Sequence, residues 1–151
     1  MHYKNTAKLI IFIFFFSLKC LGNNFASIKS KTNLRAGPGK QYPINWTLTL
    51  PSMPIKIIEE DLTYSKVELH DGTVGWIWNA TISNKRTFIV IKESYIYNKK
   101  NEKIALIKKN VILQNLECDY FINEKKSCKV KINSLKGYIN EKSLWGIINT
   151  N

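Results

Sequence analysis

Cysteine and histidine are scarce in this chain, and their scarcity limits the chemistry that it can carry. The 151 residues include only three cysteines and two histidines. Beyond the apolar start, only Cys118, Cys128 and His70 remain as soft metal ligands. A zinc site usually takes four ligands, so the sequence argues against a metal site. A catalytic Cys–His pair is a weak alternative, because the residues around either cysteine do not resemble a nucleophile motif.

Acidic residues are also few. The chain has 11 Asp and Glu against 23 Lys and Arg, which gives a formal net charge of +12. A basic surface can favour nucleic acid, anionic lipid or an anionic polymer. A second interpretation stays open, since a coding bias towards Lys, Asn and Ile produces the same excess. The charge therefore does not identify a partner by itself.

The first 26 residues have the layout of a secretory signal peptide. Lys4 and Lys8 precede an apolar run over residues 9–18 whose one polar residue is Ser17, and small residues then offer cleavage near Gly22 or Ala26. A membrane span needs about 20 apolar residues, so an uncleaved anchor is the weaker interpretation. The sequence predicts an exported protein, periplasmic or secreted, that meets the membrane only through an uncleaved signal peptide.

The remaining cysteines agree with export. Cys20 suggests a lipoprotein, but Lys19 stands where a small residue is expected. Cys118 and Cys128 are then an even pair in an exported chain, which predicts one disulfide.

Long helical periods are absent after the signal peptide, and short apolar runs alternate with turn signals instead. Residues 64–69 alternate with period two, as a half-buried strand does. Asp71-Gly72 predicts a hairpin turn of type I′, and residues 74–78 form the returning strand. Short strands joined by tight turns indicate an all-β fold, a small antiparallel barrel.

The pattern occurs twice. Val67-Glu68-Leu69 followed by Gly75-Trp76-Ile77 is matched by Val130-Lys131-Ile132 followed by Gly137-Tyr138-Ile139. The second hairpin is one residue shorter. Two copies of roughly 60 residues predict one domain over residues 28–86 and another over 87–147.

Several motifs resemble one known family. Residues 34–39, Leu-Arg-Ala-Gly-Pro-Gly, then Tyr42-Pro43-Ile44 and Trp46, resemble the opening of bacterial SH3-like (SH3b) domains. Gly75-Trp76-Ile77 is similar to their closing strand. Leu144-Trp145-Gly146-Ile147 resembles the end of a family of small exported proteins with two such domains in tandem.

The resemblance implies two SH3-like barrels with no active site and no cofactor. It implies a non-catalytic binding or targeting module of the cell envelope, with peptidoglycan or an envelope protein as partner. A small cell-wall-modifying hydrolase is the alternative, although a Ser/His/Asp or Cys/His/Asp constellation is missing. Nucleic acid ranks below both, because an exported protein rarely meets it.

Five residues are candidates for binding. Arg35 lies beside the Gly-Pro-Gly loop, where it could grip a carboxylate or tie the loop to carbonyls of its own domain. Tyr42, Trp46, Tyr64 and Trp76 could line an aromatic groove for an extended segment. Trp78 alternates away from Ile77 and is expected to be the exposed aromatic, which makes it the fifth candidate. The structural role is the stronger interpretation for Arg35, whereas Tyr42 and Tyr64 are nearly balanced between groove and core.

Three further expectations concern other residues. Trp76 is expected in the core, because a barrel this small usually buries its tryptophans. His70 is expected to be a solvated turn residue. Three lysine pairs make the second domain basic, namely Lys99-Lys100, Lys108-Lys109 and Lys125-Lys126. The last two pairs together are expected to attract an anionic polymer.

Overall fold

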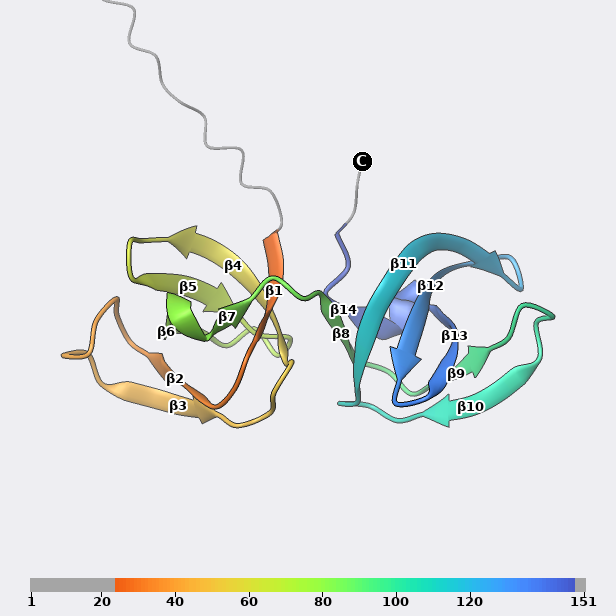
Figure 1. Ribbon diagram of the computed structural model, residues 1–151, viewed down its shortest axis with the longest axis horizontal. Helices are drawn as coiled ribbons and strands as arrows, with labels where there is room; N and C mark the ends of the chain where they lie inside the picture. The colour runs from red at the N-terminus through yellow and green to blue at the C-terminus, as the bar shows by residue number, and fades with distance from the viewer. Residues whose placement is uncertain (1–23, 149–151) are drawn as a thin grey trace, which may run out of the picture.

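The computed structural model describes residues 24–148, which form two antiparallel sheets of seven strands each (Figure 1). The first sheet has the strand order β3-β2-β6-β5-β4-β1-β7. Its strands are β1 (Asn24–Ile28), β2 (Thr32–Arg35), β3 (Ile44–Leu48), β4 (Pro54–Glu60), β5 (Tyr64–Glu68), β6 (Val74–Trp78) and β7 (Ile82–Ser83). A 3₁₀ turn, η1 (Asn79–Thr81), joins β6 to β7.

The second sheet repeats this order as β10-β9-β13-β12-β11-β8-β14. Its strands are β8 (Thr87–Val90), β9 (Ser94–Tyr97), β10 (Lys103–Ile107), β11 (Ile112–Ile122), β12 (Lys125–Ile132), β13 (Leu135–Asn140) and β14 (Leu144–Trp145), with η2 (Glu141–Ser143) before β14. The prediction of an all-β chain with two SH3-like barrels in tandem is confirmed. Within residues 24–148, no helix is long and apolar enough to cross a membrane.

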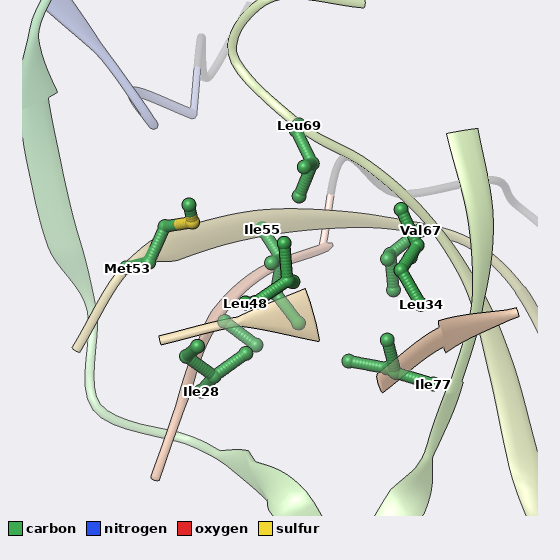
Figure 2. Packing of buried hydrophobic residues seen from close by; sticks show 9 residues of the cluster. Ile28, Leu34, Leu48, Met53, Ile55, Val67, Leu69 and Ile77 are labelled. Carbon is green, nitrogen blue, oxygen red and sulfur yellow. The ribbon is translucent and has the colours of Figure 1, made fainter. Parts of the chain in front are cut away.

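Period-two patterning builds the first core. Leu34, Ile55, Val67 and Ile77 are fully buried, and Figure 2 shows them pointing towards one another from four strands. Gly75 faces this core as well, and a Cβ atom there would lie 2.6 Å from the Leu34 side chain. Glycine is therefore needed where β6 passes over Leu34.

Trp76 corrects one expectation. It lies between Gly75 and Ile77 on β6, which both face the core, so its own side chain points to the outer face of the sheet and is only half-buried. The alternation of side chains along β6 therefore decides the position of Trp76, and it outweighs the general tendency of small barrels to bury their tryptophans.

The first strand begins earlier than the expected domain. Asn24–Ile28 pairs with β4 and β7, and Ala26 is 5 % exposed within the core. Cleavage near Gly22 leaves this strand whole, whereas cleavage after Ala26 removes three of its five residues. The rest of the predicted signal peptide, residues 1–23, lies outside the described residues.

The hairpin between β5 and β6 differs from its prediction. A type I′ turn needs positive φ at both central residues, but in residues 70–73 only Gly72 has one, at 84°. The predicted turn type is therefore wrong, and the loop is a wider one closed by Leu69 and Thr73. The Asp71 carboxylate accepts a hydrogen bond of 2.9 Å from the Thr73 backbone, which lowers the pKa of Asp71.

Strand register confirms the repeat. Val67 pairs with Gly75 in the first sheet, and Val130 pairs with Gly137 in the second. The copies differ in one arm, because β11 has 11 residues where β4 has 7. At the base of this longer β11–β12 arm, Cys118 and Cys128 form the predicted disulfide.

The two sheets meet through specific contacts near β1 and β8 (Figure 1). The Thr87 hydroxyl donates a 2.7 Å hydrogen bond to the Ser52 carbonyl. The Trp145 ring packs edge-on against Phe25, with centroids 5.0 Å apart. His70 lies 6.5 Å from the same ring and is half-buried, with Nδ1 enclosed and unbonded among the described residues. The expectation of a solvated His70 is therefore wrong.

Candidate binding site

A pocket of about 460 Å³ opens on the outer side of the first domain. It brings together three of the five candidate residues, namely Arg35 from β2, Tyr64 from β5 and Trp78 from β6. Lys31 and Lys40 complete its charged lining. The pocket therefore combines an aromatic wall with cationic groups.

Strand pairing sets the aromatic wall. Tyr64, the first residue of β5, is the register partner of Trp78, the last residue of β6. Tyr64 is buried, whereas Trp78 is 51 % exposed. The Thr81 hydroxyl donates to the Trp78 carbonyl over 2.7 Å and lies 3.0 Å from the hydroxyl of Thr32. The backbone beneath Trp78 is thus fixed to two neighbouring segments, and its ring faces solvent.

Arg35 is tied to its own loop. Its Nη1 donates to the carbonyl oxygens of Lys40 and Tyr42, at 3.2 and 2.8 Å. The Gly-Pro-Gly loop is packed closely there, since a Cβ at Gly37 would lie 2.5 Å from the Tyr42 ring. Nη1 therefore has the structural role, and within residues 24–148 the Nε and Nη2 groups make no hydrogen bond.

The charge lining the pocket has one sign. Lys31, Arg35 and Lys40 contribute three cations, and no carboxylate is among its lining residues. Such a pocket can hold a carboxylate through the cations while an apolar surface lies against Trp78.

Tyr42 and Trp46 do not line the pocket. Tyr42 covers Gly37, and Trp46 stands 62 % exposed on the edge strand β3. The sequence interpretation missed Lys31 and Lys40. Their positions on either side of the Leu-Arg-Ala-Gly-Pro-Gly segment were a usable signal, but the overall excess of lysine concealed it.

Catalytic groups are not gathered at this site. Both Cys118 and Cys128 are in the disulfide of the second domain, and His70 lies at the junction between the domains. Among residues 24–148, no group of three or more His, Cys, Asp or Glu side chains could hold a metal ion.

Comparison with known families assigns the segment that carries the pocket. Residues 30–83 match the bacterial SH3 domain. This segment is a bacterial SH3 domain. All the pocket residues named above fall within the SH3 match.

Solved structures with similarity to the chain include NlpC2 from Trichomonas vaginalis, at 13 % identity and a TM-score of 0.35, covering 83 % of this chain and 48 % of that one. NlpC1 from Trichomonas vaginalis is similar at 12 % identity and a TM-score of 0.33, covering 80 % and 45 %. The chain thus spans about half the length of these structures. None of the curated proteins matches the sequence.

Proposed function

We propose that this protein is a non-catalytic binding module of the cell envelope, and that its SH3 domain binds cell-wall polymer through the pocket around Trp78. The observation that carries the proposal is the joining of an exposed tryptophan and three cations in one hollow. Cell-wall peptidoglycan offers sugar faces for an aromatic ring and carboxylates for the cations. Bacterial SH3 domains commonly bind this polymer, which supports the same ligand.

The disulfide supports the proposal from a second direction. A disulfide between Cys118 and Cys128 is typical of proteins outside the cytoplasm, where thiols are not kept reduced. We therefore place the protein in the periplasm or outside the cell, with a cleaved signal peptide, where it meets the wall.

Co-sedimentation with purified wall sacculi tests the proposal. The Trp78→Ala variant should bind at least about fivefold more weakly, because an aromatic side chain that becomes buried against a ligand commonly contributes more than about 1 kcal/mol to the free energy of binding. Trp46→Ala is the matched control, since Trp46 is equally aromatic and more exposed but lies outside the pocket. Its binding should stay unchanged.

Three outcomes would contradict the proposal. Release of soluble wall fragments during incubation would identify a hydrolase. Equal loss in both tryptophan variants would remove the pocket as the site. Failure of the unsubstituted protein to sediment, together with capture of one envelope protein from solubilised membranes, would make a protein segment the ligand.

A further inference from the structure

The second domain has a pocket at the same place in the fold. Ser127 and Asn140 are register partners between β12 and β13, as Tyr64 and Trp78 are between β5 and β6. Both Ser127 and Asn140 line a pocket of about 670 Å³, and Tyr97 of β9 lines it too. Each domain therefore has a pocket at the equivalent position of the fold, but the two pockets are lined by different side chains.

The longer arm of the second domain forms one wall of this pocket. Residues 121–127, at the end of β11 and the start of β12, all contribute to the lining. Cys118 and Cys128 close the base of the arm, and Tyr120 packs edge-on against Tyr138 with centroids 4.9 Å apart. At the rim, Phe121 is 71 % exposed. The arm is thus braced against β13 and presents an apolar ring beside the opening.

Charges of both signs line this second pocket. Four lysines and three glutamates are among its lining residues, namely Lys92, Glu93, Glu124, Lys125, Lys126, Glu141 and Lys142. Lys126 lies 3.4 Å from Asp119 and 3.9 Å from Glu141, so these groups already have partners. Within residues 24–148, no ion pair is formed by the other three lysines or the other two glutamates.

A ligand with charge of one sign would meet repulsion from part of this lining. A ligand that carries both ammonium and carboxylate groups can pair with both sets. The first pocket differs, because its charged lining is cationic throughout.

We propose that the pocket walled by the β11–β12 arm is a second ligand site, and that it binds a short zwitterionic peptide. The peptide's carboxylates pair with Lys92, Lys125 and Lys142, and its ammonium groups pair with Glu93 and Glu124. The volume of the pocket falls within the range of about 300–1,000 Å³ that is usual for ligand pockets. This site does not depend on the function proposed for the first domain, because no residue is shared between the two pockets.

The lysines expected to act together are separated by the fold. Lys108 and Lys109 lie in the turn before β11, whereas Lys125 and Lys126 follow its far end. The 11 residues of β11 stand between them, so the two pairs lie at opposite ends of this strand. Of these four lysines, Lys125 and Lys126 line the pocket and Lys108 and Lys109 do not, which makes Lys108 and Lys109 a matched control for loss of two charges.

Titration of the isotope-labelled protein by NMR tests this site, with the tetrapeptide Ala-Glu-Lys-Ala bearing free termini as probe. Amide shifts should concentrate at Tyr97, Phe121 and Asn140. Acetyl-Glu-Glu-Glu and Lys-Lys-Lys-amide should bind at least about fivefold more weakly than the zwitterion, because each leaves one set of charges unpaired.

Paired variants separate the site from the general charge. Lys92→Gln with Lys142→Gln should weaken tetrapeptide binding at least about fivefold, whereas Lys108→Gln with Lys109→Gln should change it less than about twofold. The proposal is overturned by equal affinity for the anionic peptide, by shifts that map away from the arm, or by equal weakening in both lysine pairs.

Discussion

Removing the Cys118–Cys128 bond should loosen the second domain and leave the first largely folded. The two cysteines are ten residues apart in sequence, and they tie neighbouring strands at the base of the β11–β12 arm. Chain-entropy arithmetic for a loop of this size gives about 3 kcal/mol. Since a small domain is stable by roughly 5 kcal/mol, the loss is a large fraction of its stability.

The substitution needs a choice of residue. Cys128 is fully buried in the second core, so a serine there would add an enclosed hydroxyl to the loss of the bond. Alanine at both positions removes the bond without that cost, although it leaves a small void. Mild reduction of the unsubstituted protein is the complementary perturbation, because it changes no side-chain volume.

Hydrogen exchange resolved by peptide is the assay. Exchange over residues 104–140 should accelerate by about a hundredfold, which corresponds to about 3 kcal/mol, while residues 33–77 change little. Free thiols at both positions in the native protein would refute the reasoning, and so would equal loss of protection in the two domains.

Three shorter predictions concern other regions. Trp145→Ala should lower the free energy of unfolding by about 2 kcal/mol, because it removes the ring that joins the two domains, and denaturant unfolding should then separate into two transitions. Gly37→Ala should destabilise the first domain by about 1–3 kcal/mol, measured by thermal unfolding, because the new Cβ meets the Tyr42 ring. The hydrogen bond to Glu117 raises the pKa of Tyr120 to about 12. This hydrogen bond should therefore stabilise the folded protein fully below about pH 10, and the stabilisation should be lost as the pH rises towards about 12. Ultraviolet titration of Glu117→Gln should show the pKa of Tyr120 falling back towards its ordinary value.

Local patterning made most of the fold predictable. The positions of Val67 and Gly75, repeated at Val130 and Gly137, revealed both barrels because side chains in strands alternate with period two. The same rule puts the Trp76 side chain on the face of β6 that points away from Ile77 and the core. The expectation that Trp76 is buried failed because a statistical preference for aromatic cores was given more weight than the alternation around it.

The pocket was predictable only in part. Arg35, Tyr64 and Trp78 stood out as polar or aromatic residues beside turn motifs, and the structure brings them together. Lys31 and Lys40 flank the Leu-Arg-Ala-Gly-Pro-Gly segment and join the pocket as well, but the overall excess of lysine hid them among the other basic residues. The mixed charge of the second pocket depends on the length of the β11–β12 arm.

The tip of that arm is also the kind of segment that proteases cut. Asn123 and Glu124 both have positive φ in its exposed turn, away from the core. Any cut between residues 118 and 128 falls inside the ring that the disulfide closes. The two fragments would then stay covalently joined, with β12 still paired to β11 and β13, so a nicked molecule would separate into pieces only after reduction.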